Sequence, residues 1–236
     1  MLNFTPVEID ALYLTLKVAL FSIAICLPTG ILVAFILSRT SFPGKWLLDG
    51  IVHLPLVMPP VVVGYLLLIL LGKRGVIGEW LYETFSITVA FSWTGAAIAS
   101  AVMAFPLMVR AVRLSIDSID QGLESAASTL GANRLRILLT ITLPLSLPGI
   151  IAGTILAFAR SLGEFGATIT FVSNIPGETQ TLPLALYNFT QLPGDQTPAI
   201  RLLLISLVLA FGALIASDVL ARRVNKRLGI NNGGAR

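Results

Sequence analysis

The strongest constraint on the fold of this chain is a run of 21 residues, Val18 to Ser38, that contains no charged side chain. A helix needs about 20 mostly apolar residues to cross the roughly 30 Å hydrocarbon core of a bilayer, because lipid offers no hydrogen-bond partner to an open backbone. Hydrophobic residues make up 56% of the chain and charged residues only 12%, whereas soluble domains carry about a quarter charged residues. The sequence therefore predicts an all-α, polytopic membrane protein.

Four more apolar stretches are long enough to cross a bilayer, so about five spans are expected in a single transmembrane domain over residues 1–236. We place them at residues 50–71, within 84–109, beyond Pro144 to about 172, and at 199–221. The stretches 72–83 and 173–198 are rich in glycine or proline and are expected to be loops. A sixth span would need residues 179–200 to re-enter the membrane, which their prolines and glycines disfavour.

Two adjacent prolines, Pro59 and Pro60, lie in the middle of the second expected span. Proline lacks a backbone N–H donor, so this pair predicts a break or bend of the helix within the membrane. The carbonyls that lose their partners need cover from protein or from a water-filled cavity. The bend therefore either improves helix packing or lines a transport pathway.

Basic residues are distributed unevenly between the two sides of the expected spans. One side has Lys73 and Arg74, with Lys17 and Arg201 at helix ends. The other side collects eleven, namely Arg39, Lys45, Arg110, Arg113, Arg134, Arg136, Arg222, Arg223, Lys226, Arg227 and Arg236. Because Lys and Arg are retained in the cytoplasm, the second side is predicted to be cytoplasmic and the N-terminus to lie outside. This topology explains the net charge of +4 better than nucleic-acid binding does.

A polar insert, residues 111–144, interrupts the apolar sequence after the third span. Its apolar residues recur at three- and four-residue spacing and predict one stripe of a short helix. They are Ile116, Ile119, Leu123, Ala126, Ala127 and Leu130. Asp120, or Ser118 with Gln121, can cap the start of this helix, and Gly131 is expected just past its end. A second helical stretch is expected from Asn133 to Pro144.

An amphipathic helix of this kind either packs on its own bundle or docks in a groove of another protein. The spacing of residues in the insert resembles the EAA loop of ABC-importer permeases. The family pattern is EAA-x3-G-x9-I-x-L-P. The residues that carry the match are Ala126, Ala127, Gly131, Ile141, Leu143 and Pro144. The resemblance implies a permease of the type I importer fold, whose loop is a coupling helix pressed into a cytoplasmic ATPase. The chain departs from the pattern at Ser125, because the acidic residue, Glu124, stands one position earlier.

Three longer segments, residues 41–68, 105–113 and 159–187, are similar to the molybdate permeases of the ModB type within that family. The core from Ser161 to Ala167 is shared with sulfate and thiosulfate permeases, so it indicates only an oxyanion carrier. The PLVMPP stretch that ends in Pro59 and Pro60 favours molybdate. Molybdate and tungstate have nearly the same size and charge, and the sequence does not separate them.

Arg160 and Glu164 are ionisable residues expected inside the fourth span, where each costs about 2.5–3.5 kcal/mol on insertion scales. They are four residues apart and would share a helix face. One interpretation is a mutually neutralising pair that fixes packing. The other is a pathway or gate, with Ser161 beside it, in which Arg160 attracts a tetrahedral oxyanion and Glu164 keeps the anion from being held too tightly.

The chain has no G-x4-G-K-[ST] phosphate loop, so ATP and Mg²⁺ are expected on a separate ATPase subunit, present in two copies, and no cofactor on this chain. The resemblance also implies a periplasmic or lipid-anchored molybdate-binding protein as a partner. Five helices form a thin wall for a pore, which favours a homodimer. The sequence thus predicts a transport subunit of the inner membrane and not an enzyme. A stand-alone channel or an ion-coupled carrier is the alternative, and it would leave the Gly131 spacing unexplained.

The remaining chemistry-bearing residues are interpreted as structural. Cys26 and His53 are the single cysteine and histidine of the sequence, so they cannot build a Cys/His metal cluster. Cys26 is expected to be a small apolar filler and His53 a satisfied residue near a helix end. Met58, Met103 and Met108 are expected in the core.

Overall fold

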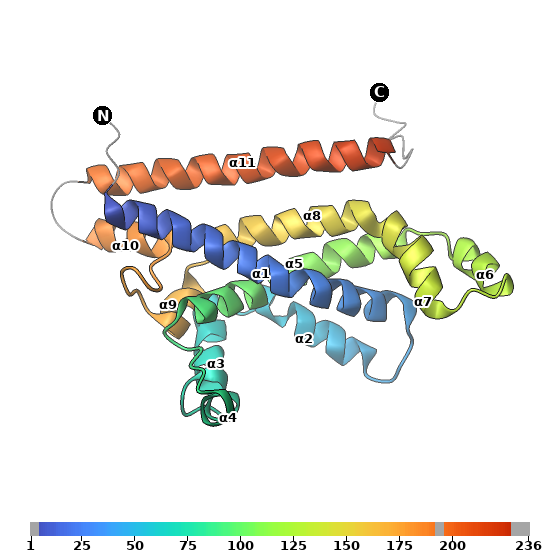
Figure 1. The fold of residues 1–236 in the computed structure, drawn as a ribbon, viewed down its shortest axis with the longest axis horizontal. Coiled ribbons are helices and arrows are strands. Elements are labelled where there is room, and N and C mark those ends of the chain that lie inside the picture. Colours follow the sequence, from blue (N-terminus) through green and yellow to red (C-terminus); the bar gives the residue numbers. More distant parts are fainter. Residues whose placement is uncertain (1–4, 192–195, 228–236) are drawn as a thin grey trace.

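The protein is described here by a computed structural model that covers residues 5–191 and 196–227, in which helices are joined by turns (Figure 1). The helices are α1 (Pro6–Arg39), α2 (Lys45–Val57), α3 (Pro60–Leu71), α4 (Val76–Phe85), α5 (Trp93–Asp117), α6 (Gln121–Thr129), α7 (Arg134–Ile137), the π-helical segment η1 (Leu138–Thr142), α8 (Leu143–Leu162), α9 (Gly166–Val172), α10 (Leu182–Gln191) and α11 (Thr197–Arg227). This arrangement confirms the all-α fold class.

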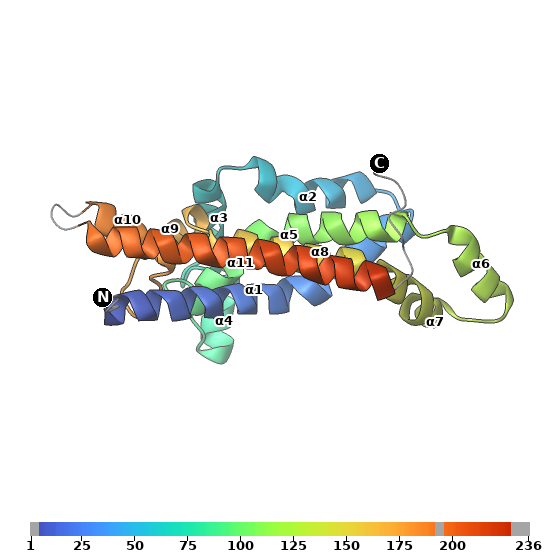
Figure 2. The same cartoon turned by 90° about the horizontal axis from the view of Figure 1, so that it is seen from above.

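Helices α1, α5 and α8 pack side by side as the central bundle (Figures 1 and 2). Met108 of α5 lies at its centre, where Gly30 of α1 and Gly153 of α8 both approach it: a Cβ on either glycine would come within 2.6 Å and 3.0 Å, respectively, of the Met108 side chain. Small residues at such positions let helix backbones come close together. Cys26 is buried in the same cluster and donates a weak hydrogen bond to the Ala101 carbonyl at 3.3 Å. Met108 and Cys26 are therefore core residues, as predicted.

The membrane-crossing helices match the expected spans in number. Four helices of the described chain are long and apolar enough to cross a membrane, and the bent pair α2 and α3 raises the number to as many as five. Several bounds differ from the prediction. Helix α5 continues past Arg110 and Arg113 to Asp117, so residues 111–117 belong to a long helix and not to the insert.

The bend between α2 and α3 measures 118° and lies at Met58 and Pro59. Both residues are extended, with ψ of 144° and 131°. Each precedes a proline, whose ring disfavours helical geometry in the residue before it. Two such residues in succession stop α2 and let α3 begin in a new direction at Pro60. The predicted break is confirmed, and α3 turns sharply away from the line of α2 (Figure 1).

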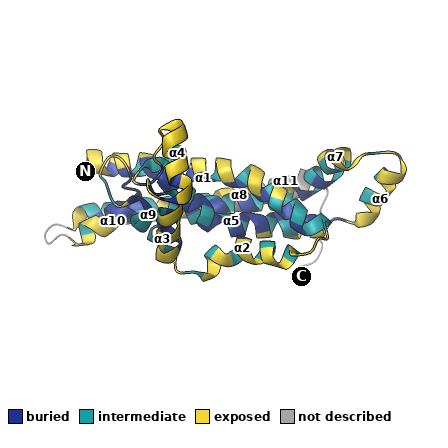
Figure 3. Ribbon diagram, turned by 90° about the horizontal axis from the view of Figure 1, so that it is seen from below, coloured by how far each residue is buried: buried dark blue, intermediate teal, exposed yellow. Residues whose placement is uncertain are grey.

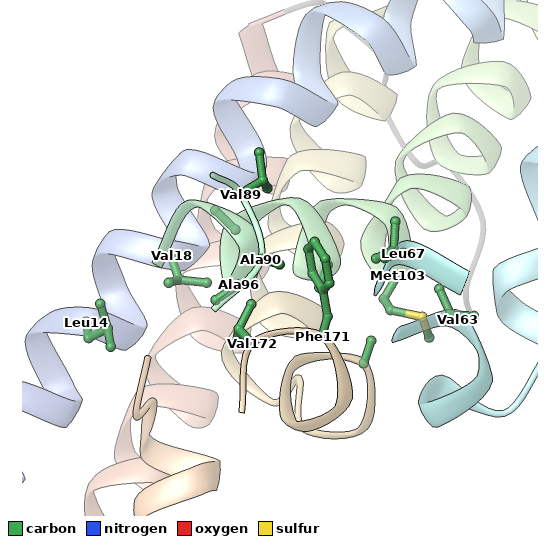
Figure 4. Packing of buried hydrophobic residues seen from close by; sticks show 13 residues of the cluster. Leu14, Val18, Val63, Leu67, Val89, Ala90, Ala96, Met103, Phe171 and Val172 are labelled. Atoms are coloured by element: carbon green, nitrogen blue, oxygen red, sulfur yellow. The ribbon is translucent and has the colours of Figure 1, made fainter. Parts of the chain in front are cut away.

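A second break divides the fourth apolar stretch, which the sequence predicts as one helix from Pro144 to about residue 172. Helix α8 ends at Leu162 and α9 begins at Gly166. Helix α9 then packs against α3 and α5 in a cluster that includes Val63, Met103 and Phe171 (Figure 4). The expectation of one continuous helix is wrong, because Gly163 ends α8 and a side chain caps the new helix, as described below.

Two segments expected to be loops contain helices. Residues 72–83 overlap α4, whose Trp80 packs edge-on against Phe85 at 5.6 Å between ring centroids. Residues 173–198 contain α10, which has Pro183 in its first turn, where the missing N–H needs no partner. Helix α10 has ten residues, too few to span a bilayer.

The two ends of the bundle carry different side chains. Helix α1 begins at one end, where Arg201 of α11 pairs with the buried Glu8 at 2.8 Å. Arg39, Arg113, Arg134 and α6 lie at the opposite end (Figure 1). This separation agrees with the charge distribution expected from the sequence. Arg236 and the side chains of Arg222, Arg223, Lys226 and Arg227 lie outside the described residues.

Candidate functional site

Helix α6 projects from the bundle at the end where α1 finishes and is mostly exposed (Figure 3). Asp120 caps its start by accepting a hydrogen bond from the Gly122 N–H at 2.8 Å. At the other end Gly131 adopts φ of +86°, and the Ala132 N–H bonds back to the Ala127 carbonyl at 3.1 Å. This is the glycine C-cap geometry. Both predicted ends of the helix are confirmed.

The predicted apolar stripe is wrong in its first part. Ile116 belongs to α5, and Ile119 lies in the turn before α6. The two isoleucines are buried, whereas Leu123 is exposed and Leu130 has 88% of its surface exposed. A helix cannot run through residues 118–120, because Asp120 is extended and takes the N-cap position. The stripe is therefore divided between the bundle, which buries the isoleucines, and the exposed α6.

Glu124 joins α6 to two other elements. Its carboxylate pairs with Arg39 of α1, with 3.0 Å between Nε and Oε2, and accepts a hydrogen bond from the Thr142 hydroxyl at 2.8 Å. Ser125, which stands where the EAA pattern has its acid, donates to the Gln121 carbonyl of its own helix at 2.9 Å. The acidic side chain one position earlier thus fixes the insert, together with an arginine that sequence reasoning treated only as a topology marker.

The second helical stretch of the insert begins as expected but does not stop at Pro144. The Asn133 side chain caps α7 by accepting from the Arg136 N–H at 2.8 Å. The backbone then continues through η1 into α8 without a turn. Pro144 lies in the first turn of α8, and the wider π-helical turn before it leaves room for its ring. Ile141 and Leu143 of the matched pattern are consequently half-buried in a continuous helix.

A cavity of about 780 Å³ opens between the end of α1, α6 and α7. Its lining is mixed: Arg39, Glu124 and Arg134 are charged, Ser125 and Ser128 are small, and Leu135 is apolar. Leu135 in this lining is exposed, and so is Leu130 directly after α6. An exposed helix with small residues and a polar hollow next to it has the shape of a docking surface.

The charged pair expected inside the fourth span lies at the break between α8 and α9. Arg160 Nη1 is 2.7 Å from Glu164 Oε2, and Glu164 Oε1 accepts a hydrogen bond from the Ala167 N–H at 2.8 Å. The same carboxylate therefore neutralises Arg160 and holds the start of α9. Ser161 is buried and shares a hydrogen bond of 2.9 Å with Ser22 of α1, a partner that sequence reasoning missed.

The proline bend and the charged pair meet in space. A Cβ on Gly166 would come within 2.7 Å of the Pro60 Cβ, and one on Gly64 would come within 2.5 Å of the Ala167 carbonyl oxygen. Helix α3 therefore rests directly on the start of α9, whose N-terminal end Glu164 caps. Pro59 is exposed beside this contact. Sequence reasoning singled out both groups of residues but gave no sign that they are neighbours.

His53 and two of the methionines have packing or local roles. His53 Nδ1 lies 2.9 Å from the Asp49 carbonyl oxygen one turn earlier in α2, and 3.2 Å from the Asp49 carboxylate. It lies inside α2 and not near its end, and it is satisfied locally. Met103 is buried and Met58 partly buried in the cluster around α9, in line with their predicted place in the core.

Comparison with known proteins identifies a family. The sequence profile described as "Binding-protein-dependent transport system inner membrane component" matches residues 26–226. The molybdenum transport system permease protein ModB of Escherichia coli (strain K12) is 60% identical over 225 residues, which cover 95% of this chain and 98% of that protein. ModB of Haemophilus influenzae is 56% identical over the same shares. The sulfate permease CysT of E. coli K12 is less similar, at 38% over 83% of this chain and 71% of CysT.

Solved structures share the fold at lower sequence identity. The structure of a bacterial ABC transporter that imports the acidic polysaccharide alginate superposes with a TM-score of 0.75 at 20% identity, over 93% of this chain and 80% of that one. The same kind of transporter in complex with an alginate-bound periplasmic protein gives a TM-score of 0.74 over 94% and 81%. These likenesses show that the fold is that of an ABC-importer membrane subunit.

Proposed function

The chain belongs to the family of binding-protein-dependent transport system inner membrane components, and we propose that it is the membrane-spanning permease of an ATP-driven importer that carries molybdate into the cytoplasm. The observation that carries this proposal is the 60% identity to ModB of E. coli along 95% of the chain. The lower identity to a sulfate permease favours molybdate over sulfate. Tungstate remains a second cargo of the same charge and shape. The chain is a multi-pass membrane protein of a permease family and not an enzyme.

The partners follow from this role. A cytoplasmic ATPase in two copies binds ATP and Mg²⁺, a periplasmic or lipid-anchored protein delivers molybdate, and two copies of this chain enclose the pathway across the inner membrane. The N-terminus lies outside, and the end of the bundle with α6 lies in the cytoplasm. The basic side chains Arg39, Arg113 and Arg134 at that end support this orientation.

The insert is the coupling element of this transporter. Helix α6 and the loop around Gly131 dock on the ATPase, and the matched residues Ala126, Ala127, Gly131 and Ile141 to Pro144 form or support the docked surface. One side-chain contact and one continuous helix support a mechanical role. Glu124 ties α6 to α1 through Arg39, and the unbroken backbone from α7 to α8 joins the insert to the central bundle. A push on α6 is therefore carried directly into two membrane helices.

The pathway runs past the meeting point of the two breaks. Arg160, with 27% of its side chain exposed, attracts the dianion, while Glu164 competes for the same guanidinium and keeps binding weak enough for release. Ser161 holds the end of α8 against α1 through Ser22. Pro59 and Pro60 set the direction of α3 relative to α2. A movement of α2 therefore changes the contact of α3 with α9.

The test is molybdate uptake into proteoliposomes that contain the chain with its ATPase and binding protein, and into vesicles with the chain alone. We expect uptake only in the complete system with ATP, and competition by tungstate but little by sulfate. Uptake by the chain alone without ATP would instead establish a channel or an ion-coupled carrier. Uptake that sulfate suppresses as strongly as molybdate does would overturn the assignment of the cargo.

A further inference from the structure

A continuous series of charged and polar contacts crosses the bundle at the end that carries α6. We propose that this series, the polar belt of Asp49, Arg113, Asp117, Ser38, Arg39 and Glu124, transmits the displacement of α6 to α2, with Arg39 as its central positioning residue. The inference rests on the proposed function, because it assumes that an ATPase moves α6. It adds the residues within this chain that carry the movement from the insert to the proline bend.

The first half of the belt connects α6 to α1 and to the end of α5. Arg39 is its hub: besides the ion pair with Glu124, its Nη2 donates to the Ile116 carbonyl at 2.9 Å and to the Ile119 carbonyl at 3.4 Å. Its Nη1 donates to the Ser38 hydroxyl at 3.3 Å. One guanidinium therefore fixes the end of α1, the turn before α6 and α6 itself, a geometry that the planar, five-donor arginine side chain suits.

The second half of the belt runs from α1 through α5 to α2. The Ser38 hydroxyl donates a hydrogen bond to the Asp117 carboxylate of α5. Arg113, one turn earlier in α5, lies 3.7 Å from Asp117 and 2.9 Å from Asp49 of α2. Asp49 also faces His53 in its own helix. Four helices are thus linked by side chains at one level of the bundle.

The link between α6 and α1 is the best placed to transmit movement, because its ion pair is more shielded from water than the Arg113–Asp49 pair, whose side chains are 28% and 38% exposed. The side chains of Arg39 and Glu124 are only 10% and 17% exposed. Exposed ion pairs contribute about 0–1 kcal/mol and yield easily, whereas breaking a largely buried pair leaves a charge without compensation. A displacement of α6 therefore moves Arg39 with it more readily than it breaks the pair.

The far end of the belt lies in the helix that leads to the proline bend. Asp49 is in the second turn of α2, and α2 ends at Val57, just before Met58 and Pro59, where the chain turns by 118° into α3. Pro60 rests against Gly166 at the start of α9. A shift of α2 therefore reaches the segment that Glu164 caps, and with it Arg160.

Arg110 provides a matched control for this inference. It lies in α5 three residues before Arg113 and is exposed, and among the residues that the structure describes its side chain has neither a hydrogen bond nor an ion pair. Arg110→Gln removes one positive charge from the same helix, beside the hollow that Asp49, Arg113 and Asp117 line, without removing any contact of the belt. Arg39→Gln and Arg113→Gln each remove a link, and Arg39→Lys retains a charge opposite Glu124.

The experiment measures molybdate uptake per ATP hydrolysed in proteoliposomes with the complete complex. We expect Arg39→Gln and Arg113→Gln to lower this ratio by about five-fold or more, the size of a typical coupling between sites, while the ATPase still copurifies with the chain. Arg39→Lys should recover part of the ratio, and Arg110→Gln should match the wild type. Because both links belong to one series, the double variant should be no worse than the poorer single variant.

A second readout does not depend on the cargo. With Cys26 replaced by alanine, a cysteine at Val57, which is 84% exposed at the end of α2, is labelled with a maleimide before and after addition of ATP and vanadate. We expect the labelling rate to change in the wild-type and Arg110→Gln backgrounds and to stay constant with Arg39→Gln. If the labelling rate of the Arg39→Gln variant changes with ATP and vanadate as the wild-type rate does, the inference is overturned. The same holds if this variant takes up as much molybdate per ATP as the wild type. A wild-type complex that responds to ATP but takes up no molybdate would overturn the proposed cargo alone.

Discussion

Arg160 and Glu164 form their 2.7 Å ion pair across a break between two helices. Arg160 is in the last turn of α8, and Glu164 follows Gly163, where that helix has ended. The Glu164 side chain is 1% exposed and the Arg160 side chain 27%. Since the second carboxylate oxygen caps α9 at Ala167, the acid is fixed on both sides. An anion that reaches this point therefore meets the arginine as the more accessible partner.

We predict that the double replacement Arg160→Gln with Glu164→Gln separates transport from stability. Arg160→Gln alone leaves a buried carboxylate without its partner and should destabilise the chain by about 3–5 kcal/mol. The double variant removes both charges, and the glutamine can still accept the Ala167 N–H, so its stability should return close to that of the wild type. Its molybdate uptake should remain at least about ten-fold lower, because the charged donor for the anion is gone.

Thermal unfolding of the purified chain and uptake by the reconstituted complex check this prediction. Glu164→Gln alone serves as the control, since it retains Arg160 and the cap of α9. If the double variant regains uptake together with stability, the pair only fixes packing, and the anion does not use Arg160.

A second prediction concerns Gly131, whose φ of +86° closes α6. Gly131→Val forces a β-branched residue into the left-handed region, which costs about 1–2 kcal/mol, and should distort the turn that presents Leu130. We expect the ATPase to be lost from the purified complex while the membrane helices remain folded, as measured by copurification and circular dichroism.

Gly177 is the matched control, because it has φ of +76° and open space around its Cβ position, yet lies between α9 and α10, toward the other end of the bundle (Figure 1). Gly177→Val carries the same backbone strain and should leave the ATPase bound. Loss of the ATPase from both variants would mean that strain in general, and not the α6 turn, weakens the complex.

Sequence reasoning succeeded where one local rule determines the structure. Asp120 and Gly131 define the two ends of α6 through capping and a left-handed turn, both of which depend only on neighbouring residues. The Pro59 and Pro60 break follows equally from two prolines in succession. The number of apolar helices depends on bilayer thickness, which the length of the charge-free runs reflects directly.

Sequence reasoning failed where a contact with a distant part of the chain determines the local structure. The break at Gly163 lies in a stretch that reads as one long helix even with Arg160 and Glu164 in it, and it forms because the Glu164 side chain caps a new helix that packs on α3. Helix α10 lies in a segment rich in turn residues, but Leu182 and Ala185 are buried against Ala11 and Leu202. Arg39 has several basic neighbours in the charge count, and only the fold shows that it is the one paired with Glu124.

The close approach of α3 to α9 leads to a last prediction. A Cβ on Gly64 would lie 2.5 Å from the Ala167 carbonyl oxygen, a backbone atom that cannot rotate away. Gly64→Ala must therefore push α3 off α9 and should cost about 1–3 kcal/mol, or roughly 2–12 °C in Tm for a chain of this size. Gly50→Ala is the control: it also lies in a helix, α2, but has open space around it, and it should stabilise by about 0.5–1 kcal/mol. Pro60 and Gly166 belong to the same contact between α3 and α9. Uptake should therefore fall more with Gly64→Ala than the loss of folded protein explains. Equal Tm values for the two variants would show that α3 and α9 do not pack this closely.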